Sequence, residues 1–202
     1  ASTFVPSFLS LEEISAAVSE GARLGIPTAA HCIGGQGLKD CIDGGVDVIE
    51  HMYMASEQDV ERLAASRCVV DLTSGIFLDP SREEFLSPAN ALKVRLNRSR
   101  VRENVARIIK ARLPFVLGTD AYHGFLYREV GYAVELGADP VTAIQGVTSR
   151  AARVCRLEDR IGKLENGMEA DIIAVEGNPL EDVSRLSQVG LVMKGGVVYR
   201  QP

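Results

Sequence analysis

The segment SLEEISAAVSEGARLGIPTAAHCIGG, residues 10–35, sets the pattern from which the fold can be predicted. Ser10 and Glu13 form the Ser-x-x-Glu capping box that begins a helix, and apolar residues recur at helical spacing until Gly25. The residues that follow, 26–31, are short and apolar and run into two glycines, as expected of a buried strand. The segment therefore predicts a helix followed by a strand that ends at His31.

The same alternation continues to residue 120, after which come two helices and then short strands between glycine-rich turns. Predicted helices cover residues 38–43, 56–66, 126–136 and 141–156, and predicted strands cover 46–51, 68–72, 114–120, 162–164, 171–175, 190–194 and 197–200. Such alternation forms parallel βα units, which are either doubly wound or closed into a barrel. We expect an α/β domain over residues 1–158 and a small β segment over residues 159–202.

The composition excludes several classes of protein. The 202 residues are 46% hydrophobic and 24% charged, as in ordinary globular proteins, and the net charge of −5 gives no attraction to nucleic acid or anionic lipid. No apolar run reaches the roughly 18 residues of a membrane span, and the first residues do not resemble a signal peptide. The four cysteines are widely spaced, which predicts reduced, mostly buried thiols. We expect a cytoplasmic protein with a small-molecule substrate and no nucleic-acid or membrane partner.

One segment differs from this acidic balance. Between Lys93 and Arg112 there are eight basic residues and a single acid, Glu103. Apolar residues at 101, 105, 108 and 109 follow helical spacing, which predicts an amphipathic helix with a solvated basic face. The alternative is a surface for phosphate or RNA.

Three predicted strands end in a residue that can bind a metal ion: His31, His51 and Asp120. The carboxyl ends of parallel strands meet at one edge of a sheet, so residues distant in sequence converge there. Two imidazoles and a carboxylate suit a divalent ion such as Zn²⁺, and Asp120 could also take a proton from bound water. Singly, each histidine could instead be a hydrogen-bonded core or loop residue, and Asp120 could cap a turn.

Strand alternation adds an expectation about which way these side chains point. It puts His31 on the face of Ala29 and His51 on the face of Ile49, and it points Glu50 and Thr119 the other way. Three residues near the strand ends are candidates for contact with substrate, with packing or loop roles as the alternative: His123, Tyr53 and Tyr122.

An ordered set of motifs resembles the amidohydrolase superfamily, especially its imidazolonepropionase-like and Xaa-Pro or arginine dipeptidase-like branch. The set consists of AAH at 29–31, GVDVIEH at 45–51, GTDA at 118–121, DPVTAI at 139–144 and RIGKLENGMEADIIAV at 160–175. The resemblance implies the second half of a (β/α)8 barrel, strands five to eight, followed by part of a β-sandwich. It also implies metal ligation by His31, His51 and Asp120, with Asp120 as general base. The implied reaction is hydrolysis, through metal-activated water, of an amide, peptide or cyclic amide C–N bond in a small amino-acid-like substrate.

The sequence departs from the family pattern in one important way. The family also uses a His-x-His pair after the first strand and usually a carboxylated Lys or a Glu after the fourth, whereas this chain has three histidines and no His-x-His. We therefore expect either part of a longer enzyme or a chain completed by another, with a noncatalytic interaction module as the rival interpretation. Open strand edges near residues 27–31 and 114–120 predict self-association or recruitment of the missing half, unless helices or terminal strands cover them.

Overall fold

The computed structural model describes residues 7–120 and 124–201, which fall into two compact units. The first unit is Ala1–Phe115 and the second is Val116–Pro202. The boundary predicted at residue 158 rests on a change of sequence pattern, and it stays a prediction.

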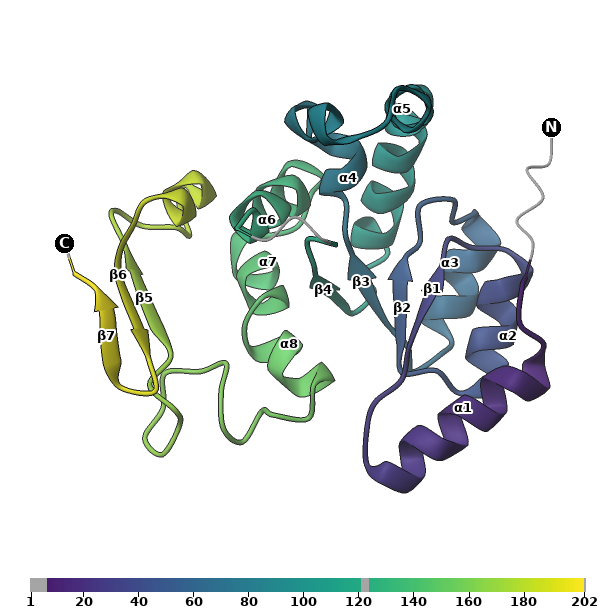
Figure 1. Ribbon diagram of the computed structural model, residues 1–202, viewed down its shortest axis with the longest axis horizontal. Coiled ribbons are helices and arrows are strands. Elements are labelled where there is room, and N and C mark those ends of the chain that lie inside the picture. The colour runs from purple at the N-terminus through teal and green to yellow at the C-terminus, as the bar shows by residue number, and fades with distance from the viewer. Residues whose placement is uncertain (1–6, 121–123, 202) are drawn as a thin grey trace. The chain divides into compact units, whose positions relative to one another are not determined.

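The first unit is built on a parallel sheet. Its strands are β1 (Ala29–Cys32), β2 (Val48–His51) and β3 (Val69–Leu72). The strand β4 (Phe115–Leu117), which begins at the last residue of this unit, comes after β3 in the strand order of the sheet. β1 pairs in parallel with β2, and β2 pairs in parallel with β3. The α/β class with a parallel sheet is therefore confirmed. β1 stands at one end of the strand order (Figure 1).

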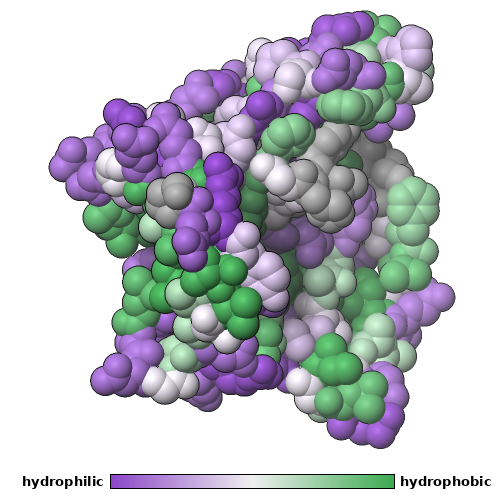
Figure 2. Space-filling view, turned by 60° about the vertical axis from the view of Figure 1, so that its left-hand side comes forward, coloured by the Kyte–Doolittle hydropathy of each residue, from purple (hydrophilic) through white to green (hydrophobic). Residues whose placement is uncertain are grey.

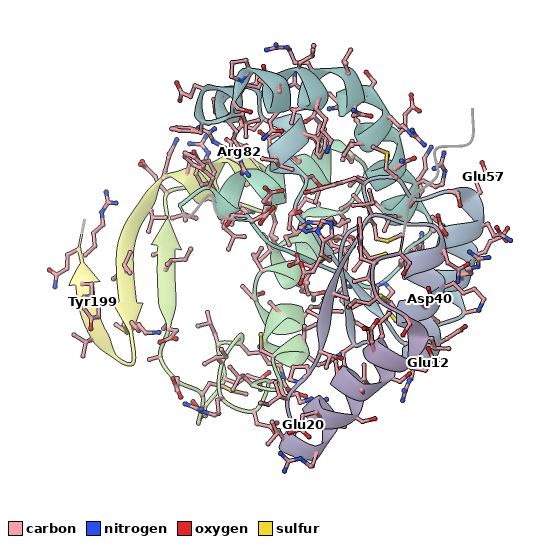
Figure 3. The ribbon with its side chains drawn as sticks, turned by 45° about the vertical axis from the view of Figure 1, so that its right-hand side comes forward. Glu12, Glu20, Asp40, Glu57, Arg82 and Tyr199 are labelled. Atoms are coloured by element: carbon pink, nitrogen blue, oxygen red, sulfur yellow. The ribbon has the colours of Figure 1, made fainter. Side chains whose placement is uncertain are left out.

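Helices connect these strands, and the sequence dictates where they begin. α1 (Leu11–Leu24) and α3 (Glu57–Ala64) each start at a complete capping box, the second formed by Ser56 and Asp59. α2 (Gln36–Gly44) lies between β1 and β2 along the chain. Figure 3 shows acidic side chains of these helices, among them Glu12, Glu20, Asp40 and Glu57, pointing outward, which accounts for part of the chain's negative charge.

The core of the first unit forms where the sheet meets the helices. The apolar side chains with at most 1% exposure in this core are Leu38, Ile49, Met52, Val70, Leu72, Val101, Val105 and Ile108. Three of them belong to α5 (Pro88–Lys110), which follows α4 (Gly75–Leu78) and the 3-10 helix η1 (Pro80–Phe85). The amphipathic helix predicted from the basic segment is thus confirmed: its apolar side is buried and its arginines lie largely at the surface.

The second unit combines three helices with a small antiparallel sheet. The helices are α6 (Leu126–Glu135), α7 (Pro140–Gly146) and α8 (Ser149–Val154). A 3-10 helix, η2 (Val183–Ser187), accompanies the sheet of β5 (Ile172–Val175), β6 (Val189–Lys194) and β7 (Val197–Arg200). The glycine-rich turn predicted between strands 190–194 and 197–200 is confirmed: β6 and β7 pair as a hairpin, and Gly195 and Gly196 both have the positive φ that a two-residue hairpin turn needs.

Two predictions for this unit are wrong. The single helix predicted over residues 141–156 is interrupted between α7 and α8, where Thr148 has φ −132° and ψ −102°. Residues 162–164 form no strand, because the chain bends at Gly162 and Lys163. Gly162 has φ +91°, and a Cβ there would lie 2.8 Å from that of Ala152, so close packing on α8 decides its conformation.

In the part of the chain that the structure describes, no helix has the length and apolar character needed to cross a bilayer.

Candidate metal centre

The structure brings two of the predicted metal ligands together. His31 lies in β1 and His51 ends β2, so the pairing of these strands makes them neighbours. Their rings meet edge to face, with centroids 4.7 Å apart and planes inclined by 64°. His51 is 9% exposed, whereas His31 lies exposed on the outer strand.

The strand register corrects the expected side-chain directions. His31 is paired with Glu50, and Glu50 with Asp71, so these three residues share one face of the sheet. Sequence alternation predicted that Glu50 points away from the face that carries the metal ligands. This is wrong for His31, because Glu50 and His31 share one face of the sheet. Simple alternation holds only where the backbone stays extended, and at His51 it does not.

The backbone leaves the strand conformation abruptly at His51. His51 has φ +78° and the next residue, Met52, has φ +54°. Left-handed conformations are uncommon for residues other than glycine and cost on the order of 1–3 kcal/mol each. Hydrogen bonds hold the turn: the Met52 N–H donates to Cys32 O at 3.1 Å, and the Met54 N–H donates to Ile33 O at 2.8 Å. The turn changes the direction in which the His51 side chain leaves the backbone.

Behind His51 lies a buried polar cluster. His51 Nδ1 is 2.7 Å from Thr73 Oγ1, and the His51 ring stacks on Tyr53 with centroids 5.1 Å apart. The Tyr53 hydroxyl donates to Thr73 O at 2.9 Å and lies 2.5 Å from Thr73 Oγ1. Thr73 was not among the predicted site residues. It directly follows β3, the same kind of position that identified the histidines, but a hydroxyl carried no comparable signal.

Side chains of α5 hold the backbone next to this cluster. The buried Asn104 side chain donates to Tyr53 O at 2.8 Å, and Arg107 donates both to Asn104 Oδ1 at 2.8 Å and to Ala55 O at 3.2 Å. The loop after β2 is therefore fixed by side chains from a helix about 50 residues further along the sequence.

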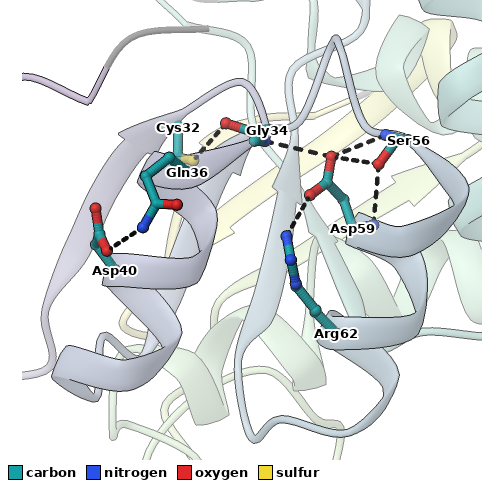
Figure 4. A network of polar contacts seen from close by, with 8 residues as sticks. Cys32, Gly34, Gln36, Asp40, Ser56, Asp59 and Arg62 are labelled. Carbon is teal, nitrogen blue, oxygen red and sulfur yellow. Dashed lines mark hydrogen bonds and ion pairs between the residues drawn. The ribbon is translucent and has the colours of Figure 1, made fainter.

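The loop after His31 is held by the carboxylate of Asp59 (Figure 4). Asp59 Oδ2 accepts hydrogen bonds from the backbone N–H of Gly35 at 3.3 Å and from the backbone N–H and hydroxyl of Ser56 at 2.9 and 2.8 Å. Beside this loop, a hydrogen bond between the thiols of Cys32 and Cys41 lowers the pKa of Cys32 and raises that of Cys41. Burial also raises the pKa of Cys41. As predicted, the cysteines are free and three of the four are buried.

The remaining predicted residues belong to the second unit. Asp120 is exposed and has φ +45°, a conformation that aspartate tolerates better than most residues. Tyr122 and His123 lie outside the described residues. Within residues 7–120 and 124–201, no group of three or more His, Cys, Asp or Glu side chains is arranged to hold a metal ion.

Comparisons with known proteins identify relatives over most of this chain. Ochratoxinase from Aspergillus niger is 33% identical over 212 aligned positions, covering 98% of the chain and 43% of that protein. Its crystal structure matches with a TM-score of 0.82, 30% identity and coverage of 96% of this chain and 46% of that one. Imidazolonepropionase from Desulfotalea psychrophila is 25% identical over 151 positions, or 72% of this chain and 32% of the relative.

A solved Xaa-Pro dipeptidase, crystallised with methionine in its active site, has a TM-score of 0.86 and 30% identity. The match covers 95% of this chain and 49% of the dipeptidase, so the chain spans about half the length of such relatives. The model of the Amidohydrolase family matches residues 6–199. With nearly the whole sequence matched, the chain belongs to the amidohydrolase family.

Proposed function

We propose that this chain supplies the second half of a barrel, strands five to eight, in a metal-dependent hydrolase, with His31, His51 and Asp120 as ligands of a divalent ion. The observation that carries the proposal is the contact between the His31 and His51 rings, 4.7 Å apart, at the ends of adjacent parallel strands. The strained backbone at His51 supports it, because such conformations concentrate at functional sites.

The donor chemistry suits zinc. Neutral imidazole nitrogens and a carboxylate form common zinc ligand sets, and sites with an open position are catalytic. When bound, the ion would supply Lewis acidity toward water and toward a substrate carbonyl. His31 and His51 would hold it through ring nitrogens, and the Asp120 carboxylate would accept a proton from the attacking water and return it to the leaving nitrogen.

The substrate that we propose is a small amino-acid-like molecule with an amide, peptide or cyclic amide bond. Relatives named as an Xaa-Pro dipeptidase and an imidazolonepropionase support this class. His123 and Tyr122 remain candidate contacts to substrate. Tyr53 remains one as well, although its hydroxyl already binds Thr73 inside the protein.

We further propose that β1 takes its missing neighbour from the preceding half of a complete amidohydrolase. Among the described strands only β2 pairs with β1, and Ala29 and His31 are exposed. A hollow of about 410 Å³ beside β1 is lined by Phe8, Leu9, Ile14 and His31 among others. Phe8 is 91% exposed. Figure 2 views a different side of the molecule and shows further apolar patches among the polar surface. The chain matches only about half the length of its relatives. We therefore take the preceding half of such a protein as the neighbour of β1.

Two measurements test the proposal. In an active protein that contains this chain, Asp120→Asn should lower kcat for a dipeptide or N-acyl amino acid by at least about 100-fold, because it removes the proton acceptor. The matched control is Asp159→Asn, an exposed aspartate of the same unit, which should leave kcat unchanged. Retained turnover in Asp120→Asn would refute the assignment.

The second measurement separates the hydrolase from the rival, a noncatalytic interaction module. Metal analysis and an amidase and dipeptidase screen are run on the chain alone and with the preceding half of a relative. Metal uptake and turnover restored by that half would support the hydrolase and its partner. Homodimerisation of the isolated chain in light scattering would assign the β1 edge to a second copy instead. A chain that binds no metal in either form would favour the interaction module.

A further inference from the structure

We infer that Cys32 and Cys41 form an oxidisable dithiol, which hydrogen peroxide converts to a disulfide that joins the end of β1 to α2. The inference does not rest on the proposed metal site, because neither cysteine is a proposed ligand. The observation that carries it is the contact between two buried sulfur atoms from different elements, both of which line the hollow beside β1.

The two sulfur atoms meet where β1 packs against α2. Cys32 is the last residue of β1, Cys41 is a buried residue of α2, and a hydrogen bond joins their thiols. Gly37 gives a second measure of this contact, because a Cβ at that position would lie 3.8 Å from Cys32 Sγ. Residues four apart lie on one face of a helix, so the Cys32 sulfur packs against the face of α2 that carries Cys41.

The other two cysteines have different surroundings. Cys68 is as buried as Cys41, with 5% exposure each, but its thiol donates to Val46 O at 3.2 Å. Cys155 is exposed and belongs to the second unit. The Cys32 thiol also lies 4.0 Å from Gly34 O (Figure 4), and such long contacts of sulfur are weak. This contact therefore leaves the Cys32 sulfur able to approach that of Cys41.

An oxidant can reach the pair through the hollow beside β1. The hollow has a volume of about 410 Å³, and its lining includes Cys32, Cys41 and the exposed Phe8. A water molecule takes up about 30 Å³ in the liquid, so a peroxide molecule with two oxygen atoms fits with room to spare. A second thiol in contact with the first turns the initial oxidation product into a disulfide before it can be oxidised further.

The oxidation needs peroxide as its only other reactant. One sulfur bonds to a peroxide oxygen as the O–O bond breaks, and the departing hydroxide takes the thiol proton, which gives a sulfenic acid and water. The second sulfur then attacks the sulfenic sulfur. The S–S bond forms, the S–O bond breaks, and the leaving hydroxide takes the second thiol proton. Two thiols thus lose two electrons and two protons, which convert one peroxide to two water molecules. Dithiothreitol reverses the change by thiol–disulfide exchange.

The disulfide should restrict the loop that follows β1. In the reduced chain, the Gly35 N–H is held by Asp59 at 3.3 Å, and the loop continues into α2. A bond between Cys32 and Cys41 would close residues 33–40 into a short ring. A ring of this size has fewer open conformations than the same loop without the bond.

Peptide mapping tests the inference directly. The sample is the Cys155→Ser chain, which cannot form cross-links between copies through the exposed thiol. After treatment with hydrogen peroxide, remaining thiols are blocked with N-ethylmaleimide in denaturant, and trypsin cleavage after Lys39 separates Cys32 from Cys41. We expect a disulfide between these two peptides, alkylated Cys68, and recovery of both thiols with dithiothreitol. Cys32 and Cys41 both alkylated after peroxide, or a disulfide to Cys68 in place of this pair, would overturn the inference.

Two variants separate the pair from the third buried thiol. In the same background, Cys41→Ala should abolish the cross-link and leave a sulfenic acid on Cys32 that dimedone traps. The matched control is Cys68→Ala, which removes an equally buried thiol and should leave the yield of disulfide unchanged. An equal loss of cross-linking in both variants would refute a specific pairing of Cys32 with Cys41.

Amide hydrogen exchange measures the consequence for the loop. Exchange at Ile33–Gly35 should slow by at least about tenfold on oxidation and return to its initial rate on reduction. It should not change at Met52–Ala55, nor at either place in the Cys41→Ala chain. Unchanged exchange at Ile33–Gly35 with the cross-link in place would refute the restriction of the loop.

Discussion

The ends of β1 and β2 carry the same kind of residue in very different surroundings. His51, at the end of β2, is buried, stacked on Tyr53 and hydrogen-bonded to Thr73, on a turn tied to α5. His31, in β1, is exposed on the outer strand, and the adjoining loop is tied to Asp59 instead. The surroundings of His51 therefore hold both its backbone and its side chain, whereas at His31 hydrogen bonds hold only the backbone of the adjoining loop.

This difference shows what preorganisation requires. An exposed imidazole can turn about its side-chain bonds, and ordering it costs conformational entropy at the moment of binding. His51 has much less of that cost left, because its ring is already packed and bonded. We expect the β1 end to gain its order only when a neighbouring strand and a metal ion are present.

The largest effect should come from breaking the core behind β2 and β3. Leu72→Ala removes a fully buried side chain next to Thr73 and should destabilise the first unit by about 3 kcal/mol through lost burial and a residual cavity. The matched change near β1, Leu24→Ala, affects a side chain that is 53% exposed and should cost about 0.5 kcal/mol or less. Urea unfolding midpoints measure both. Equal losses would mean that the ends of β1 and β2 are equally ordered.

A smaller change should sharpen the comparison by loosening only the β2 turn. Asn104→Ala removes two hydrogen bonds, one that Asn104 donates to Tyr53 O and one that it accepts from Arg107. The loss should lower the free energy of unfolding by about 1–2 kcal/mol. Asn97→Ala in the same helix removes only a bond to Lys93 O and serves as the control for helix propensity, with a change near zero. Amide exchange should rise at Met52–Ala55 and not at Ile33–Gly35. Faster exchange in both loops would show that α5 does not act selectively on the β2 end.

The smallest effect concerns the ion pairs that anchor η1 to α5. The Arg98 guanidinium, with help from Arg95, holds the pKa of Glu83 below its ordinary value. A carboxylate with a lowered pKa stabilises the fold above its unfolded pKa of about 4.3, and the contribution is lost as pH falls through the folded value. Glu83→Gln should therefore lower Tm slightly at pH 7, with the deficit vanishing in acid. The exposed neighbour variant, Glu84→Gln, should show no such deficit. A deficit independent of pH would point to lost packing instead of charge.

The sequence alone predicted the elements whose signals are local. The capping box at Ser10, the helix start at Ser56, the strands that carry His31 and His51 and the glycine-rich turn at residues 195–196 depend on neighbouring residues, and the structure has each of these. The position of His31 and His51 at the ends of parallel strands, and the resemblance to amidohydrolases, followed from the same patterns. The break in the helix at Thr148 and the bend at Gly162 were missed because packing between segments decides them.

Only the tertiary structure decided how the candidate site is supported. Alternation along a strand could not predict that His51 takes a positive φ, because hydrogen bonds to the loop after β1 hold that turn. Nor could it predict Thr73 or Asn104, whose partners lie 22 and 51 residues away. Metal-ligand candidates can be recognised from residue type and local position. The groups around them are ordinary hydroxyls and amides, which gain their meaning only when folding brings them together and removes the water that would otherwise satisfy their hydrogen bonds.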